Sequence, residues 1–377
     1  MNICFVNMPL EYYSPVSGGA ISTITAELAA ELLQIGHGVQ IVTYTDSNPT
    51  YDMGAVIDLG PMPTLSKPLR AVDRLSRRLL RRPFVGYEQY RRRVRRALRA
   101  LAPTPNVVVA FNDFAAPRII RRALPDARTV TWLQNEPPAH RQRDLTDPDA
   151  VVAVSDYIRD RTIEAGVPAS KVRTILNGVN LNTFHAEGRR QPDRPRVLLV
   201  GRLDPNKGFH VALTALAEAR AAGCQFETTL AGARWWYGAE EPTPYEIELF
   251  KSVESLGGRY VGLVPRGEIA DLFREHDLAF VLSLAQEPFG LVVLEAMASG
   301  CAVIASPRGG IPQAAGNGAI LVDPDDSAAV FSATSRLLKG ADELQEWRNR
   351  ALVHAASASW RVRAESFLDL VESLGAA

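Results

Sequence analysis

Short apolar runs alternate with longer segments of helical periodicity along most of the chain. After the first run, apolar residues recur at helical spacing from Ile21 to Ile35, and Gly36 marks the end of that predicted helix. Strand–helix–strand order of this kind places the strands parallel in one sheet. The runs expected to form strands in the N-terminal half are Ile3–Val6, Val39–Thr43, Val107–Phe111, Thr129–Leu133, Val151–Val154 and Val172–Leu176.

A polar linker, Glu187–Pro195, interrupts this series, and a second one begins directly after it. Its predicted strands are Arg196–Val200, Phe226–Ala231, Arg259–Leu263, Leu278–Leu282, Ala302–Ala305 and Ala319–Val322. With 377 residues, the chain is long enough for two cores. The pattern therefore predicts an α/β protein of two Rossmann-like, doubly wound domains facing each other across a cleft. We expect one domain over residues 1–187 and the other over 188–359.

Loops that follow the strands are the expected ligand sites, because open α/β sheets bind ligands at the carboxyl ends of their strands. Gly18 and Gly19 follow the first strand, although two glycines before a helix also suit a plain tight turn. Arg202 and Lys207 lie in a loop that begins at Gly201, after the first strand of the second series. Two cations at a helix start can hold a diphosphate, whereas the alternative is a solvated basic pair.

The stretch Glu287–Gly300 combines charge with an expected helix start. Pro288 suits the first turn of a helix and Gly300 its exit. The first free N–H groups would then be those of Gly290, Leu291 and Val292, a ready anion site. Glu295 shares a helix face with Leu291, which places its carboxylate about one turn from a bound phosphate. This predicts a clamp for a sugar nucleotide; the alternative is a βα unit with a capping and a surface glutamate.

Composition narrows the classes of partner. The 42 basic and 42 acidic residues cancel, so no overall field favours nucleic acid. Cys4, Cys224 and Cys301 lie in or beside apolar runs, as buried reduced thiols of a cytoplasmic protein do. No apolar run approaches the length of about 20 residues that spans a bilayer. The sequence predicts no metal site and no cofactor: Asp147–Asp149 and Asp323–Asp325 resemble Asp-x-Asp metal motifs, but we interpret both as turns.

Residues 70–99 differ from the rest of the chain. They hold twelve arginines against only Asp73 and Glu88, with apolar residues in between. A solvated helix face is the plain interpretation. The functional alternative is an amphipathic basic surface that contacts an anionic membrane or an anionic acceptor.

Taken in order, these motifs resemble the retaining glycosyltransferases of family 4, which have the GT-B fold. The resemblance covers nearly the whole chain and is densest from Val154 to Asp323. The motifs that carry it are Ser17-Gly18-Gly19, Gly36-His37, Val154-Ser155, Lys171–Val179 with its Asn177-Gly178, Gly201–Gly208, Glu287–Gly300 and Gly309-Gly310-Ile311-Pro312.

The resemblance implies a role for each matching residue. Arg202 and Lys207 would bind the donor diphosphate, Glu295 the ribose, and Glu287 the transferred sugar at the reaction centre. The other residues assigned to donor binding are Phe289, Gly290, Leu291, Gly18, Gly19, Asn177, Gly201 and Gly310. A C-terminal helix within residues 360–377 would cross back to the first domain. The implied reaction is metal-independent transfer of a glycosyl group from a nucleotide sugar, with retention.

Three positions depart from the family pattern. Family members often carry a histidine after the strand Thr129–Leu133, where this chain has Gln134 and Asn135 and its nearest histidine is His140. We assign these three residues to the loop that contacts the sugar and the acceptor. The usual aspartate after Asn-Gly-Val is Asn180, and the usual acidic residue after Gly-Gly-Ile-Pro is Gln313.

The leading hypothesis is therefore a cytoplasmic hexosyltransferase that uses a nucleotide sugar, with uridine favoured by resemblance, and a hydroxyl-bearing acceptor. A second hypothesis makes the acceptor a membrane lipid and residues 70–99 the contact with the inner face of the membrane. A sugar-nucleotide epimerase of the same fold and a non-catalytic nucleotide-sugar sensor are the remaining alternatives.

Overall fold

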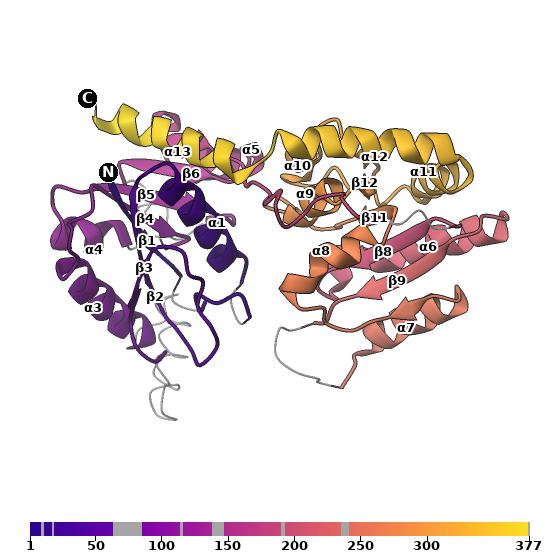
Figure 1. The fold of residues 1–377 in the computed structure, drawn as a ribbon, viewed down its shortest axis with the longest axis horizontal. Coiled ribbons are helices and arrows are strands. Elements are labelled where there is room, and N and C mark those ends of the chain that lie inside the picture. Colours follow the sequence, from indigo (N-terminus) through magenta and orange to yellow (C-terminus); the bar gives the residue numbers. More distant parts are fainter. Residues whose placement is uncertain are drawn as a thin grey trace. The chain divides into compact units, whose positions relative to one another are not determined.

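The computed structural model describes residues 1–8, 11–16, 19–62, 85–113, 116–137, 147–189, 193–234 and 241–375. These residues form two compact units, each with its own sheet (Figure 1). The first unit consists of Met1–Val154, Ile158–Ile175 and Arg363–Ala377. The second consists of Ser155–Tyr157 and Leu176–Val362. The short segment Ser155–Tyr157 thus leaves the first sheet to pack with the second unit.

The first unit has a seven-stranded parallel sheet in the order β3-β2-β1-β4-β5-β6-β7. In the register of this sheet Ile3 pairs with Val39 on one side and with Val107 on the other. The strand order reverses direction at β1, which creates a topological switch point between β1 and β4. The strands are β1 (Asn2–Val6), β2 (Gly38–Thr43), β3 (Ala55–Asp58), β4 (Val107–Phe111), β5 (Arg128–Leu133), β6 (Ala150–Ala153) and β7 (Val172–Thr174).

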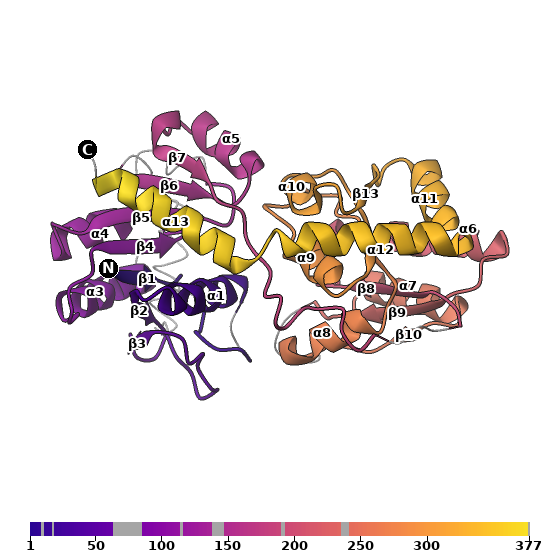
Figure 2. The same ribbon diagram turned by 45° about the horizontal axis from the view of Figure 1, so that its top comes forward.

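Helices cover both faces of this sheet, which explains why its strands are apolar throughout (Figures 1 and 2). Cys4 and Val6 point into a core formed with α3 and α4. Phe5 points to the other face, where its ring lies 6.5 Å from that of Phe367 on the C-terminal helix. The helices are α1 (Ala20–Gln34), α3 (Val85–Arg99), α4 (Ala116–Ala123), α5 (Asp156–Glu164), the short 3-10 helix η2 (Ala169–Lys171) and α13 (Trp360–Gly375).

The second unit repeats this plan with a six-stranded parallel sheet in the order β10-β9-β8-β11-β12-β13. Its strands are β8 (Arg196–Val200), β9 (Glu227–Ala231), β10 (Arg259–Tyr260), β11 (Leu278–Val281), β12 (Ala302–Ala305) and β13 (Ile320–Leu321). Its helices are η3 (Pro205–Lys207), α6 (Phe209–Ala221), α7 (Pro244–Ser255), α8 (Arg266–Arg274), α9 (Leu291–Ala298), α10 (Ile311–Ala315), α11 (Ser327–Lys339) and α12 (Ala341–Ala356).

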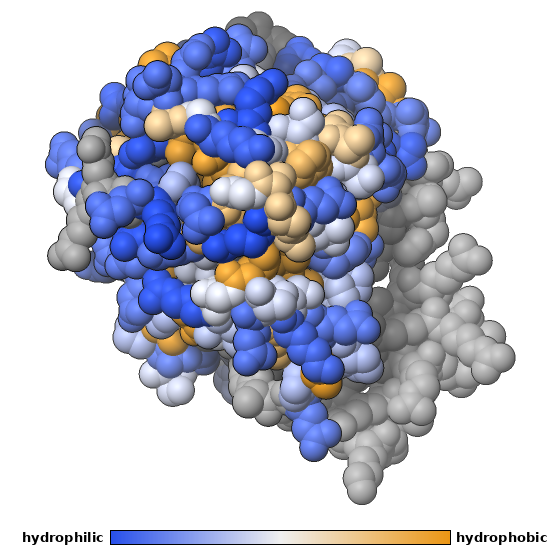
Figure 3. Space-filling view, turned by 90° about the vertical axis from the view of Figure 1, so that its right-hand side faces the viewer, coloured by the Kyte–Doolittle hydropathy of each residue, from blue (hydrophilic) through white to orange (hydrophobic). Residues whose placement is uncertain are grey.

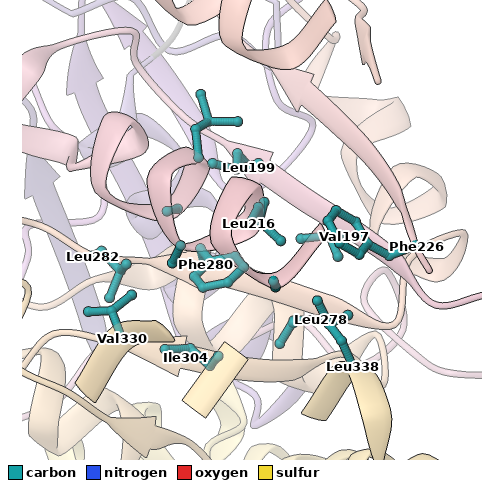
Figure 4. Close-up of a cluster of buried hydrophobic side chains, with 14 of the residues drawn as sticks. Val197, Leu199, Leu216, Phe226, Leu278, Phe280, Leu282, Ile304, Val330 and Leu338 are labelled. Atoms are coloured by element: carbon teal, nitrogen blue, oxygen red, sulfur yellow. The ribbon is translucent and has the colours of Figure 1, made fainter. Parts of the chain in front are cut away.

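One continuous core joins the second sheet to its helices. Val197 and Leu199 of β8 and Phe280 of β11 point into the same layer as Leu216 of α6 (Figure 4). Val330 of α11 belongs to the same buried cluster. Each of these five side chains is at most 2 % exposed. The strands of this sheet are thus packed against helices within one buried core.

The sequence predicted this architecture correctly, and the runs Val107–Phe111, Arg196–Val200 and Ala302–Ala305 are strands with the predicted limits. The structure adds β3, which the sequence analysis missed because its four residues (Ala55–Asp58) give little alternation. The last strand of the second sheet, β13, is only two residues long, shorter than the predicted Ala319–Val322.

The chain leaves the first sheet earlier than the predicted limit at residue 187. Residues 176–187 pack with the second unit, where the N–H of Val179 donates to the carbonyl of Ala358 at 2.9 Å. Gly178 lies between these segments: a Cβ there would come within 2.8 Å of the Trp360 nitrogen. Neither Asn177 nor Gly178 has a positive φ angle. Gly178 is required by close backbone approach instead.

The three cysteines are free and buried, as predicted. Burial raises the pKa of Cys301 to about 11, so this thiol stays protonated at neutral pH.

Among the helices of the described residues, none is long and apolar enough to cross a membrane. The end of the second unit seen in Figure 3 is mainly hydrophilic, with its most extensive apolar area near the centre and smaller apolar spots elsewhere.

Candidate functional site

The candidate site lies at the switch point of the second sheet. Strand β8 stands between β9 and β11, so the loops after β8 and β11 leave the sheet in neighbouring positions. These loops are joined by a hydrogen bond of 2.8 Å from the N–H of Leu284 to the carbonyl of Asn206. Strand β12 is the next neighbour of β11, so the loop after β12 leaves the sheet beside the other two loops.

Lys207 and Glu287, two of the predicted catalytic residues, meet at this point. The Nζ of Lys207 donates to Oε1 of Glu287. The hydroxyl of Ser283 donates to the same oxygen at 3.0 Å. The two side chains are only 29 % and 20 % exposed, so water screens this ion pair incompletely. The sequence analysis did not identify Ser283, although it lies in the same loop, four residues before Glu287.

Glycines allow the loops around Glu287 to pack against one another. Gly310 donates its N–H to the Glu287 carbonyl at 2.7 Å. Gly309 has a φ of +60°, and a Cβ there would overlap the Glu287 carbonyl oxygen and lie 2.7 Å from its nitrogen. Gly208 likewise presses against the carbonyl of Leu282 with a φ of +67°. The backbone of Gly309 and Gly310 therefore packs directly against that of Glu287, and Gly208 packs in the same way against Leu282, so only glycine fits at these contacts.

The helix start beside Glu287 differs from the prediction in one respect. Helix α9 begins at Leu291, and Gly290 with a φ of 95° is the residue that caps it. Pro288 therefore precedes the helix, and our placement of it in the first turn is wrong, because the left-handed Gly290 turns the chain first. The N–H of Val293 donates back to the Gly290 carbonyl at 3.0 Å. The N–H groups of Leu291 and Val292 lie at the start of the helix and form the positive end of its dipole. Gly300 follows the end of the helix, as predicted, and its N–H donates to the Met297 carbonyl at 2.9 Å.

Glu295, the predicted ribose ligand, lies one turn into α9 and is 6 % exposed. Its Oε1 accepts a bond of 3.1 Å from Nη2 of Arg266, the first residue of α8. Arg266 was missed by the sequence analysis. The signal was present, because Pro265 and Arg266 follow the predicted strand Arg259–Leu263 and so reach the same edge of the sheet.

The remaining predicted residues of the second unit occupy distinct positions. Arg202 is 44 % exposed, and its Nη2 lies 3.9 Å from Oδ2 of Asp204, a weak surface pair. Gly201 packs its carbonyl against Gly232, where a Cβ would overlap it. The side chain of Phe289 is buried, so only its backbone can face a ligand. Asn177 is buried in the segment that pairs with residues 358–360.

Other predicted residues belong to the first unit. Gly19 caps α1, and the carboxylate of Glu11 accepts from the Ser22 N–H of that helix at 3.0 Å. Burial is the main cause that raises the pKa of Glu11. The N–H of Gln134 donates to Oδ1 of Asn112 at 2.8 Å, and Asn135 is exposed. Gly18 and His140 lie outside the described residues.

Arginines neutralise both Asp-x-Asp pairs, in keeping with the interpretation as turns. Arg118 and Arg121 lie 2.5 and 3.0 Å from Asp147 and Asp149, respectively. A single guanidinium nitrogen of Arg308 bonds to Asp323 at 2.8 Å and to Asp325 at 2.6 Å. Within the described part of the chain, no group of three or more His, Cys, Asp or Glu side chains is arranged to hold a metal ion.

A helix start, paired charges and close-packed glycines at a switch point define a nucleotide-binding α/β protein. Two family models specify its class. Residues 18–183 match "Glycosyltransferase Family 4" and residues 182–353 match "Glycosyl transferases group 1". The chain belongs to the group 1 glycosyltransferases, and it is an enzyme that transfers a sugar from a nucleotide sugar.

Curated relatives support this assignment. The chain is 26% identical over 277 residues to the lipopolysaccharide 1,2-N-acetylglucosaminetransferase of Salmonella typhimurium, covering 70% of this chain and 71% of the relative. It is 31% identical over 264 residues to D-inositol 3-phosphate glycosyltransferase 2 of Catenulispora acidiphila. That match covers 65% of this chain and 59% of the relative.

Solved structures share the fold at lower identity. HepE of Anabaena, solved in complex with UDP-glucose, aligns with a TM-score of 0.70 at 19% identity, over 99% of this chain and 100% of that one. Sucrose-phosphate synthase from Thermosynechococcus elongatus aligns with a TM-score of 0.73 at 20% identity, over 100% and 99% of the two chains. The predicted GT-B glycosyltransferase fold is confirmed.

Proposed function

We propose that this enzyme moves a hexosyl or N-acetylhexosaminyl group from a UDP-linked sugar to a hydroxyl of a small-molecule or glycan acceptor. Transfer proceeds with retention and without a metal ion. The observation that carries the proposal is the meeting of Lys207 with Glu287 beside the start of α9, one turn from the buried Glu295. The UDP-glucose complex of HepE and the N-acetylglucosaminetransferase among the relatives support the donor class.

The charged groups then bind different parts of the donor. The N–H groups at the start of α9 hold the diphosphate together with Lys207 and Arg202. Glu295, held in place by Arg266, accepts hydrogen bonds from the ribose hydroxyls. Glu287 keeps Oε1 bonded to Lys207 and Ser283, and presents Oε2 to a hydroxyl of the transferred sugar.

The reaction breaks the bond between the anomeric carbon and the diphosphate oxygen and forms a bond from that carbon to the acceptor oxygen. Negative charge develops on the departing diphosphate, where Lys207, Arg202 and the start of α9 stabilise it. The same phosphate oxygen takes the proton of the acceptor hydroxyl, on the face that the acceptor attacks. Retention follows because attack and departure share that face.

Product formation from a panel of nucleotide sugars tests this proposal, with Glu295→Gln as the diagnostic variant. Loss of a charge-assisted hydrogen bond to ribose should lower kcat/KM about 10–100-fold, mainly through a higher KM for the donor. The exposed Glu254→Gln on α7 is the matched control and should behave as the unmodified enzyme. Unchanged donor kinetics in both Glu295→Gln and Arg202→Ala would show that the site is assigned wrongly.

NMR of the donor alone, showing interconversion without an acceptor, would identify an epimerase instead. Donor binding without transfer or slow hydrolysis would identify a sensor.

A second candidate, transfer to a membrane lipid, rests on helix α3. Its apolar residues Tyr90, Val94 and Leu98 are buried in the core of the first unit, so this helix cannot insert them into a bilayer. The described part of the basic segment is thus a helix face exposed to solvent, and any contact through it is electrostatic. Four arginines form this exposed face: Arg92, Arg95, Arg96 and Arg99.

Vesicle binding decides whether this arginine face contacts a membrane. Each arginine near an anionic surface contributes about 1 kcal/mol, so changing all four to glutamine should weaken binding at least about 100-fold. We expect co-sedimentation with vesicles of equal parts phosphatidylcholine and phosphatidylglycerol, reduced by salt. The control replaces four exposed arginines of the second unit by glutamine: Arg194, Arg259, Arg336 and Arg350. No binding of the unmodified enzyme to these vesicles removes the candidate.

A further inference from the structure

Two reciprocal hydrogen bonds join Gln313 to Asp156. The N–H of Asp156 donates to Oε1 of Gln313 at 2.5 Å. The Nε2 of Gln313 donates to Oδ2 of Asp156 at 2.7 Å. Asp156 is the first residue of α5, and Gln313 lies in α10, directly after the loop of Gly309 and Gly310. The pair thus fastens the segment Ser155–Tyr157 to the loop after β12.

Ser155 fastens the same segment to the loop after β11. Its hydroxyl, buried together with the rest of the residue, donates to the Pro288 carbonyl at 2.6 Å. Gly310 lies between these groups: a Cβ there would overlap the Pro288 carbonyl and lie 2.8 Å from the Cβ of Ser155. Three stretches of backbone therefore meet without space between them. The loop that carries Glu287 is thus held both by the Ser155 bond and by close packing against Gly309 and Gly310.

The chemistry of residue 313 follows from its partner. Asp156 offers one donor, its N–H, and one acceptor, its carboxylate. The amide of glutamine supplies the matching acceptor and donor, so both bonds form without a shared proton. A carboxylate at 313 would keep the first bond but place two negative oxygens at hydrogen-bond distance. Such a pair is stable only when it shares a proton.

We propose that Ser155, Asp156 and Gln313 are positioning residues that fix the Glu287 loop for transfer, and that Gln313 must be neutral because it faces Asp156. This explains why the chain departs from the acidic residue common at this position. The inference rests on the proposed function, since Glu287 is placed at the transferred sugar there. None of the three residues needs to touch the substrate.

Gln313→Glu tests the inference through a pH profile that loss of packing alone would not produce. At pH 8 the two carboxylates repel, the loop shifts, and kcat should fall about 10–100-fold, since a displacement near 1 Å costs that much. Toward pH 5 one proton is shared, and the activity relative to that of the unmodified enzyme should recover. The melting temperature, followed in parallel, separates unfolding from misplacement.

The double variant Asp156→Asn with Gln313→Glu reverses the polarity of the pair. Its asparagine amide donates to the new carboxylate, both bonds re-form, and kcat at pH 8 should return to within about threefold of the starting value. If Gln313→Glu keeps full activity with an unchanged pH profile, or if the double variant is no better than the single one, the inference fails. If the unmodified enzyme itself neither transfers nor hydrolyses a sugar from any nucleotide donor, the proposed function fails instead.

Discussion

Replacing Lys207 with methionine is expected to lower kcat/KM for the donor about 100–1,000-fold, the loss typical when one group that stabilises a developing anion is removed. Two effects combine. The departing diphosphate loses the cation next to it, and Glu287 loses the partner that orients its carboxylate. Since the Glu287 side chain is only 20 % exposed, water cannot fully replace that partner.

Lys251→Met is the matched control, because Lys251 is an exposed lysine on α7 in the same unit. It should keep full activity. Lys207→Arg keeps the charge but not the shape of the ammonium group, so an intermediate loss is expected. Steady-state kinetics with varied donor measures all three variants. A loss in Lys207→Met below about threefold would mean that this cation does not act on the leaving group.

Gly309→Ala is expected to lower kcat about 100-fold while the enzyme remains folded. A Cβ at this position would overlap the backbone of Glu287, so the loop must move, and a movement near 1 Å is enough for such a loss. The φ of +60° adds a left-handed strain of about 1–2 kcal/mol.

Gly257→Ala separates these two contributions. Gly257 has nearly the same φ, +64°, in the same unit, but a Cβ there meets no atom within 4 Å. This control should lose some thermal stability and keep its activity. Melting temperature and kcat are measured for both variants. Equal activity in the two would contradict the claim that Gly309 shapes the Glu287 loop through close contact.

The sequence predicted the fold well because parallel strands that helices cover on both faces are apolar throughout. The runs around Val107–Phe111 and Arg196–Val200 show this pattern, and their limits were correct. Strands at the sheet edges are harder to predict, as β3 and the two-residue β13 illustrate. Their short length leaves too few buried positions to produce a recognisable pattern.

Within the site, the sequence indicated which loops meet but not how their side chains pair. The pairing of Glu295 with Arg266 joins residues far apart in the chain, and only the folded sheet brings them together. The placement of Pro288 was wrong for a local reason: the left-handed Gly290 delays the helix by three residues. A proline indicates that a helix is near, whereas the cap decides where it begins.

The replacement of the usual acidic residue by Gln313 had no explanation in the sequence. Its partner Asp156 lies 157 residues earlier in the chain, and no sequence motif contains both residues. The bonds between them exist only because Ser155–Tyr157 packs with the second unit. Departures from a family pattern are thus best interpreted once the neighbouring charges are known.

Hydrogen–deuterium exchange with and without a bound nucleotide sugar tests the central claim most directly. A thermal-shift screen first selects the donor, since a ligand at 100 times its Kd adds about 2.7 kcal/mol of stability. We predict that this donor protects the backbone of three loops of the second unit: 201–208, 283–295 and 306–313. Protection that falls elsewhere, with all three loops exchanging as in the free enzyme, would contradict the placement of the nucleotide sugar at this switch point.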